Sequence, residues 1–282
     1  MRDTGIEPRN EWRYYKPSRS EFASASTSIH TDRMGPKHAD RLAKLQAAVI
    51  ACERCPRLRR HCVRVAREKR RQYRDWEYWG KPIPSFGDPH ARLLIIGLAP
   101  AAHGGNRTGR IFTGDRSGTF LMRAMHTAGF ANKPDSVHRD DGLRLRDAYI
   151  TAVVRCAPPD NKPTPVEIET CRHYLEQELA LLKNVRAVLC LGRIAYEGYL
   201  AALRRMGHPL RRAAFPFSHG GEHALPAPLP RLFTAYHPSQ QNTLTGKLTP
   251  RMMDRVFARI RDWLEECKRH PRPPSSSSSS SS

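Results

Sequence analysis

Short apolar runs alternate with longer amphipathic stretches through the middle of the chain. Apolar runs of about four to eight residues, rich in branched side chains, are typical of strands buried on both faces of a parallel sheet. The pattern predicts such strands at 92–97, 149–154, 187–191 and 232–236. Apolar residues recur at helical spacing at about 117–129, 165–183, 193–205 and 250–267. We therefore expect an α/β protein in which helices cover a parallel sheet.

The two ends of the chain lack both periodicities. Residues 1–37 are rich in Ser, Thr, Arg and Pro, and residues 271–282 are a proline-rich stub followed by a serine run. Such compositions bury too little apolar surface to offset the conformational entropy lost on folding. We expect one folded domain at 38–270 between two disordered tails, with a core drawn from the 39% of residues that are hydrophobic.

The net charge of the chain indicates what kind of molecule it binds. The chain has 48 Lys and Arg against 27 Asp and Glu, a formal net charge of +21, which favours a polyanion. Ten of the basic residues lie in the segment 54–74, with aromatic residues close behind. Such a run is usually a solvated face, but beside this net charge a nucleic-acid backbone is at least as good an explanation.

The same composition bears on compartment and assembly. The longest apolar stretch falls far short of the roughly 20 residues that cross a membrane, and no secretory signal is recognisable. We expect a monomeric protein of the bacterial cytoplasm, associated with the nucleoid and without membrane contact.

Seven cysteines, an odd number in a chain without an export signal, make a disulfide framework the weaker explanation. Cys52 and Cys55 form a C-x-x-C pair, and Cys156 and Cys171 follow the second predicted strand at a wider spacing. Four thiolates from two separate segments can enclose a zinc ion or an iron-sulfur cluster, and the spacing does not choose between them. Cys62 lies close enough to the first pair to replace one of its members.

Ligands of parallel α/β sheets bind beyond the carboxyl ends of the strands, so the segments after the four strands are the candidate site. After the first strand, Gly97–Asp115 is long and glycine-rich, and Arg107 and Arg110 are candidates to meet phosphates. The segment lacks the Gly-Lys-Ser/Thr ending of a nucleotide-binding P-loop, and a flexible surface loop is the alternative. After the fourth strand, His237 is placed to donate a hydrogen bond to a substrate, although a structural histidine is the commoner case.

Taken together, these motifs resemble the uracil-DNA glycosylase superfamily, and within it the iron-sulfur branch of bacteria and archaea called family 5 or type b. The resemblance covers about 45–265 and rests on Gly97-Leu98-Ala99-Pro100-Ala101, on 109–115, 151–163 and 237–242, and on the four cysteines. It implies a three-layer α/β/α sandwich with a central four-stranded parallel sheet that binds DNA at its carboxyl edge. It also implies a four-iron four-sulfur (4Fe-4S) cluster, structural rather than redox-active, on Cys52, Cys55, Cys156 and Cys171.

The resemblance implies roles for individual residues in cleaving the N-glycosidic bond of a nucleotide flipped out of DNA. This reaction develops positive charge on the sugar and negative charge on the departing base. Phe112 would stack on the base, and His237 would hydrogen-bond the oxygen where negative charge collects. Asp115 would steady the sugar cation or orient water, with a helix cap as its alternative role. The other implied site residues are Asn161 at the base or the water, Gly97, Ala99, Ala152 and Ser239 around the base, and Leu244 as a wedge into the duplex, for which packing under its own loop is the alternative.

Two positions depart from the sister families. An acid after the first strand is replaced by Leu98, Ala99 and Ala101, and an asparagine near the end of the second strand is replaced by Ala152. Losing that amide removes a donor and acceptor pair that reads the uracil edge, so discrimination should be poorer. We expect a monofunctional glycosylase that removes uracil and other deaminated bases, hypoxanthine among them, and initiates base excision repair. The alternatives are a noncatalytic iron-sulfur or zinc nucleic-acid-binding protein and a related enzyme acting on free nucleotides or RNA.

Overall fold

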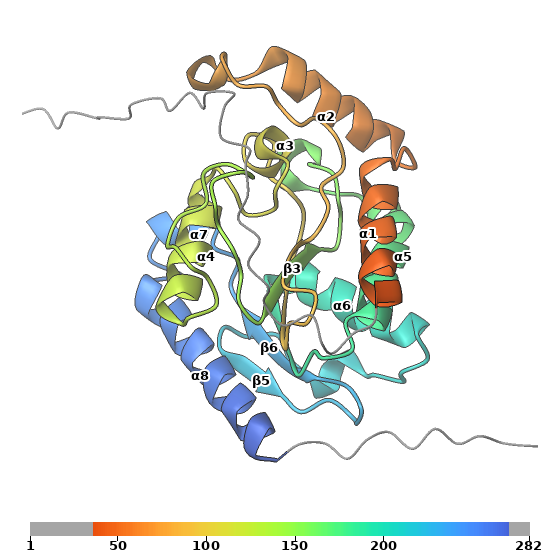
Figure 1. Ribbon diagram of the computed structural model, residues 1–282, viewed down its shortest axis with the longest axis vertical. Coiled ribbons are helices and arrows are strands. Elements are labelled where there is room, and N and C mark those ends of the chain that lie inside the picture. Colours follow the sequence, from red (N-terminus) through yellow and green to blue (C-terminus); the bar gives the residue numbers. More distant parts are fainter. Residues whose placement is uncertain (1–35, 271–282) are drawn as a thin grey trace, which may run out of the picture. The chain divides into compact units, whose positions relative to one another are not determined.

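The computed structural model describes residues 36–270 (Figure 1). Its helices are α1 (Pro36–Ile50), α2 (Pro56–Glu68), α3 (Gly105–Thr108), α4 (Arg116–Thr127), α5 (Pro165–Leu181), α6 (Arg193–Arg205), α7 (Gln240–Leu244) and α8 (Pro250–Arg269). Its strands are β1 (Phe86–Gly87), β2 (Leu93–Gly97), β3 (Ala148–Ala152), β4 (Ala187–Leu191), β5 (Gly221–His223) and β6 (Arg231–Ala235). Single 3-10 turns lie at η1 (Arg71–Tyr73), η2 (Pro159–Asn161) and η3 (Arg212–Ala214). The tails expected at 1–37 and 271–282 lie outside the described residues, except that α1 already begins at Pro36.

The sheet has the order β1-β3-β2-β4-β6-β5. Strands β3, β2, β4 and β6 run parallel, and they are the four strands that the sequence predicts. The edge strands β1 and β5 pair antiparallel with β3 and β6 and were not expected. The four-stranded parallel sheet is therefore the centre of a six-stranded mixed sheet. Short edge strands of this kind also limit pairing with other chains.

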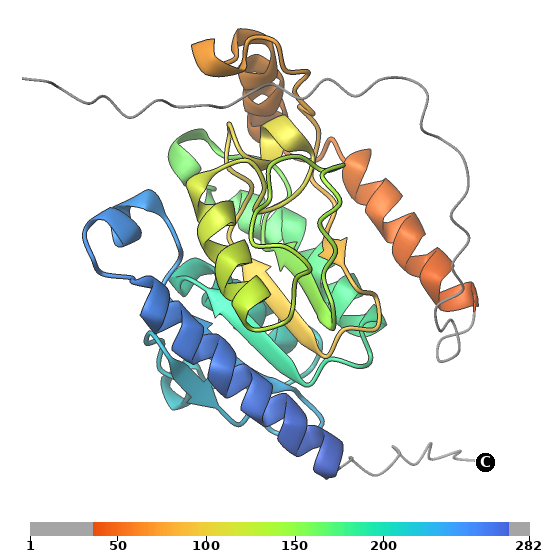
Figure 2. The ribbon, with the colours of Figure 1, turned by 60° about the vertical axis from the view of Figure 1, so that its left-hand side comes forward.

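Helices cover both faces of the sheet, which makes the expected three layers (Figure 2). Successive side chains of a strand point to opposite faces. In β2, Leu94 and Ile96 pack into the core on the side of α1, α5 and α6, and Leu93 and Ile95 pack into the core shared with α4 and α8. Every residue of β2, β3 and β4 is buried, which explains why these strands are continuous apolar runs in the sequence.

Local capping fixes where the helices after the strands begin. Thr164 accepts a hydrogen bond from the Glu167 amide, and the Glu167 carboxylate accepts one from the Thr164 amide, so a capping box starts α5. Pro165 occupies the first turn, where its missing N–H costs nothing. Within residues 36–270, no helix is both long and apolar enough to span a membrane.

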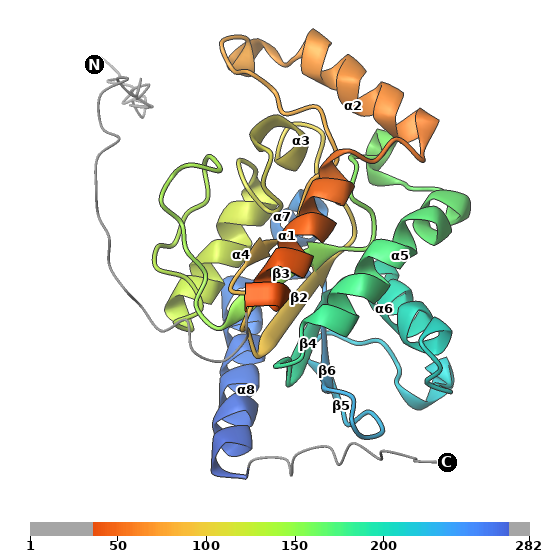
Figure 3. The same cartoon turned by 45° about the vertical axis from the view of Figure 1, so that its right-hand side comes forward.

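The chain order of the strands creates a crevice at the carboxyl edge of the sheet. From β2 the chain enters α4 on one face, and from the neighbouring strand β4 it enters α6 on the other. Such a divergence leaves room for a ligand between the two strand ends. Helix α2 packs against α3 beside the same edge, where the Asn106 amide donates to the Cys62 carbonyl at 3.1 Å (Figure 3).

Candidate active site

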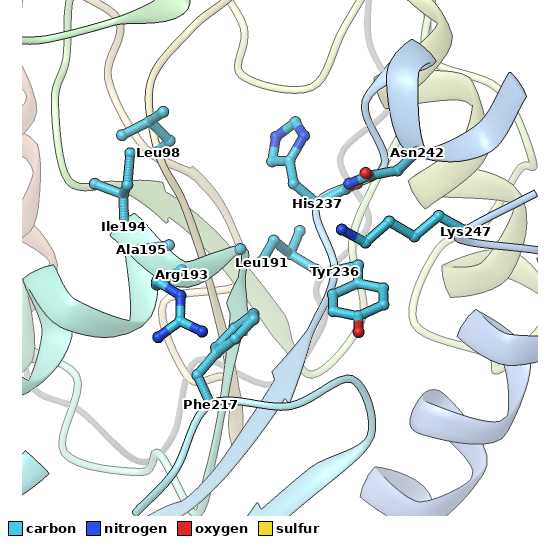
Figure 4. Close-up of a pocket in the computed structure, with 11 residues that line it drawn as sticks. Leu98, Leu191, Arg193, Ile194, Ala195, Phe217, Tyr236, His237, Asn242 and Lys247 are labelled. Carbon is cyan, nitrogen blue, oxygen red and sulfur yellow. The ribbon is translucent and has the colours of Figure 1, made fainter. Parts of the chain in front are cut away.

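A pocket of about 460 Å³ opens where β2, β4 and β6 end (Figure 4). It lies at the divergence of the chain, where the strand pattern predicted a site. Its wall is contributed by the segments following these three strands and by two loops: Leu98, Leu191, Gly192, Arg193, Ile194, Ala195, Phe217, Tyr236, His237, Asn242 and Lys247.

Phe112 stands beside this pocket in a strained conformation. Its ring centroid is 5.9 Å from that of His237, with the ring planes inclined by 31°. Its φ of +50° lies in the left-handed region that favours glycine, and strain of this kind is concentrated at functional sites. The ring rests on the end of β2, because a Cβ atom at Gly97 would lie only 2.9 Å from it. Glycine at this strand end thus makes room for an aromatic wall at the candidate base site.

His237 lies just beyond the end of β6, partly buried in the wall of the pocket. Its carbonyl accepts a hydrogen bond of 2.8 Å from the Asn242 side chain. Burial lowers the pKa of His237 to about 4, so the ring is neutral at pH 7. A neutral imidazole still carries one N–H and can donate it to a developing oxyanion.

Asp115 caps α4, as the alternative interpretation of this residue expected. One carboxylate oxygen accepts from the Gly118 amide at 2.8 Å. The other faces the loop after β2, where a Cβ atom at Gly104 would lie 1.9 Å from it. Burial raises the pKa of the Asp115 carboxyl. The cap uses one oxygen and leaves the other directed toward the loop beside the site.

Arg107 and Arg110 do not face solvent, so the expectation that they meet phosphates is wrong. Their exposed fractions are 3% and 4%. The Arg107 guanidinium lies 3.8 Å from the Tyr73 ring centroid and 4.0 Å from that of Trp76, and it donates to the Gly114 carbonyl at 2.6 Å. Arg110 forms a 2.8 Å ion pair with Asp141 and donates to Ser136. Both arginines hold the glycine-rich segment in shape, which excludes the alternative of a flexible loop.

The structure brings some of the other sequence-predicted residues together and leaves others apart. Ala152 ends β3 directly beside Gly97 and lies in the same core as Phe112. Ala99 is partly buried, and Ser239 caps α7 by accepting from the Asn242 amide. Leu244 is 71% exposed at the end of α7, so it does not pack under its own loop. Asn161 is exposed on η2 and does not line the pocket.

Of the eleven residues that line the pocket, sequence reasoning named His237 alone as a site residue. Arg193 lies just beyond one predicted strand and Tyr236 ends another, so the carboxyl-end rule alone was a usable signal for them. Phe217 and Lys247 lie in irregular segments whose sequence carries no such signal, and only the fold brings them to the pocket.

The four cysteines expected to bind a cluster line one small pocket on the α5 side of the sheet. Cys156 and Cys171 are buried, Cys52 and Cys55 are partly buried, and none forms a disulfide. Among residues 36–270, no three ligand side chains converge closely enough for a single metal ion. Zinc draws its four sulfurs together with bonds of about 2.3 Å, whereas each thiolate of a four-iron cluster binds its own iron and stands farther from the others. The donor set therefore fits the cluster better than zinc.

Cys62 does not line the cysteine pocket. It is fully buried beside Cys156, and its Sγ lies 3.6 Å from the Ala157 carbonyl oxygen.

The segment 54–74 contains both structural and free arginines. Arg57 pairs with Glu167 at 2.8 Å, and Arg59 pairs with Glu53 at 3.1 Å. In the part of the chain that the structure describes, the remaining arginines are exposed without an ion pair: Arg54, Arg60, Arg64, Arg67, Arg70, Arg71 and Arg74. Because α2 stands beside the carboxyl edge, these charges lie on the same side of the molecule as the pocket.

Comparison with known proteins identifies this combination of fold and site. Residues 84–261 match the model of the uracil DNA glycosylase superfamily, and the chain belongs to that superfamily. It is 51% identical over 218 residues to a type-5 uracil-DNA glycosylase of Thermus thermophilus, a match that covers 77% of this chain and 95% of the relative. It is 49% identical over 220 residues to one of Mycobacterium tuberculosis, covering 78% of this chain and 80% of the relative.

A type-4 uracil-DNA glycosylase of Pyrobaculum aerophilum is less similar, at 28% identity over 170 residues, 60% of this chain and 69% of the relative. Within the superfamily, the chain is thus of the type-5 group. The resemblance drawn from the sequence is confirmed, and so is the expected uracil-DNA glycosylase activity, whereas removal of hypoxanthine stays a prediction. The enzyme hydrolyses the N-glycosyl bond of uracil in DNA and acts in base excision repair.

Proposed function

We propose that this type-5 uracil-DNA glycosylase removes hypoxanthine as well as uracil and leaves an abasic site. One observation carries the proposal: Gly97 and Ala152 end neighbouring strands side by side, next to the Phe112 ring. Neither side chain can hydrogen-bond a base edge. A site that holds a base by stacking, with little edge readout, discriminates poorly between bases of similar chemistry.

The side chains around the Phe112 ring have separate roles in cleavage of the N-glycosidic bond. Phe112 stacks on the flipped base, and the neutral His237 donates to the base oxygen as negative charge develops there. Donation from a neutral ring keeps the proton on the enzyme, so the base departs as a stabilised anion. The Asp115 oxygen not used by the cap stabilises the sugar cation or orients the attacking water. Asn161, exposed on η2 in the segment that follows β3, reaches the base or the water once DNA covers this edge.

For the cofactor, we assign a 4Fe-4S cluster to Cys52, Cys55, Cys156 and Cys171. When bound, it would cross-link the chain structurally without redox chemistry. The four thiolates come from the segment before α2, the segment after β3, and α5. Holding these together fixes the arginine-bearing helix α2 against the domain.

DNA is gripped from outside the pocket. The exposed arginines of 54–74 contact phosphates, and Leu244 enters the duplex at the position the flipped nucleotide leaves. The enzyme works as a monomer on the bacterial chromosome in the cytoplasm.

Single-turnover cleavage of oligonucleotides with one uracil or one hypoxanthine tests the proposal, with alkali to reveal abasic sites. We expect Ala152→Asn to retain uracil excision and to lower hypoxanthine excision, because one polar base contact is worth roughly 1 to 3 kcal/mol of discrimination. Ala152→Leu is the control, since it adds similar volume without an amide. If both variants lose both activities together with thermal stability, Ala152 serves packing and the specificity argument fails.

A further inference from the structure

The far half of the large pocket is not used by the chemistry described above. The reacting base stands against Phe112 and His237, at the ends of β2 and β3. Beyond His237 the pocket continues over the ends of β4 and β6. Phe217 and Tyr236 form its aromatic side, with ring centroids 6.4 Å apart and planes inclined by 40°. Both rings are only half-buried, so part of each ring is exposed in the pocket.

Two cations stand over these rings. The Arg193 guanidinium carbon is 5.3 Å from the Phe217 ring centroid, and Lys247 Nζ is 5.0 Å from that of Tyr236. Figure 4 shows Arg193 and Lys247 on opposite sides of the pocket, with the two rings between them. The lining residues include no Asp or Glu, and within residues 36–270 neither cation forms an ion pair. Both cations are exposed, so their contacts with the rings are weak enough to yield to an anion.

An aromatic surface flanked by unpaired cations fits a nucleotide. A flat base can stack on an aromatic ring whatever its sequence, and the cations can meet a phosphate. The substrate itself brings such a group, because the neighbour of the flipped nucleotide is covalently tied to it and His237 borders both halves of the pocket.

We propose that the far half of the pocket is a second nucleotide subsite for the nucleotide next to the flipped one in the same strand. Its base stacks on Phe217 and Tyr236, and its phosphate lies between Arg193 and Lys247. A nucleotide bound in this subsite no longer stacks within a duplex. The subsite therefore favours single-stranded or frayed DNA. The inference rests on the proposed placement of the reacting base at Phe112 and His237, and it does not require hypoxanthine activity.

The test removes the neighbouring base from the substrate and the aromatic ring from the enzyme. Single-stranded oligonucleotides carry one uracil, and the nucleotide on its 5′ or 3′ side is either normal or a tetrahydrofuran that keeps the phosphate but lacks a base. Binding and single-turnover cleavage are measured for the wild type and for Phe217→Leu, which keeps apolar volume against Tyr196, 5.6 Å away between ring centroids.

We expect wild-type binding to weaken by about 5- to 150-fold when the tetrahydrofuran stands on one particular side of the uracil, the range expected for one stacked base, and not when it stands on the other side. Phe217→Leu should bind the normal oligonucleotide that much more weakly and show no further loss with the tetrahydrofuran. If the wild type and Phe217→Leu respond equally to the missing base on both sides, the subsite does not exist. Because the reporter is uracil, a failure to cleave hypoxanthine would refute the broader substrate range without affecting this result.

Discussion

The pH dependence of cleavage tests whether His237 acts as a neutral donor. Burial lowers its pKa to about 4, against an ordinary value of 6.5. At pH 5 roughly a tenth of the rings would then be protonated, whereas nearly all ordinary histidines would be. The contribution of His237 to the rate of uracil release should therefore stay nearly constant from pH 8 down to about pH 5, with no inflection between 6 and 7.

Asp115 limits the rate on the acid side as well. It acts as a carboxylate, and burial raises its pKa, so its contribution is lost at a higher pH than that of an ordinary aspartate. Asp115→Asn removes this group and leaves His237 as the titrating donor. His237→Ala removes the donor instead and should slow single-turnover release on the order of 10²-fold at pH 7.5, the usual effect of losing one such hydrogen bond.

The assay is single-turnover release of uracil from one oligonucleotide, with enzyme in excess, at pH 4.5 to 8. A wild-type rate that falls with a midpoint between pH 6 and 7, in a transition that the His237→Ala profile lacks, would show that the ring titrates normally and would refute the reasoning.

The lowered pKa of His237 also affects the stability of the fold. His237 binds a proton more readily in the unfolded state, where its pKa is about 6.5, than in the folded state, where its pKa is about 4. Protonation therefore favours unfolding: the free energy of unfolding is not reduced by this group above about pH 6.5, and it decreases as the pH falls toward 4.

The remaining predictions concern the cofactor, the core and the wedge. Protein purified without oxygen should be brown, and Cys171→Ser should bleach it and lower its melting temperature, whereas colourless wild type with stoichiometric zinc would exclude the cluster. Glu178→Ala should lower the free energy of unfolding in urea by about 3 to 5 kcal/mol, because it leaves Arg155 buried without its partner, while Glu265→Ala on the surface should not change it. Leu244→Gly should slow cleavage of uracil in duplex DNA and leave single-stranded cleavage nearly unchanged, and equal losses on both would argue against a wedge.

The features that the sequence alone determined are those that depend on the burial and the neighbours of a single segment. The four parallel strands were predictable because they are buried on both faces, apart from Arg231 at the start of β6, and strands in that environment are mainly apolar. The start of α5 was predictable because Thr164 and Pro165 cap it through their immediate neighbours. The carboxyl-end rule led from these strands to the segments that carry Phe112 and His237. The sequence also indicated the four cysteines that line one pocket, with Cys62 as an alternative member.

Contacts between distant segments were decided only by the tertiary structure. Strands β1 and β5 are too short to carry a periodicity and exist because β3 and β6 offer them partners. The sequence suggests that Arg107 is a phosphate ligand. The structure buries it against the rings of Tyr73 and Trp76, which lie more than 30 residues earlier in the chain. Phe217 meets Tyr236 on one side of the pocket because β5, which begins four residues after Phe217, pairs with β6. The pattern of apolar and polar residues in a segment reflects the burial of that segment alone. Whether two distant segments contact each other depends on the order of the strands and on which face of the sheet each connection follows.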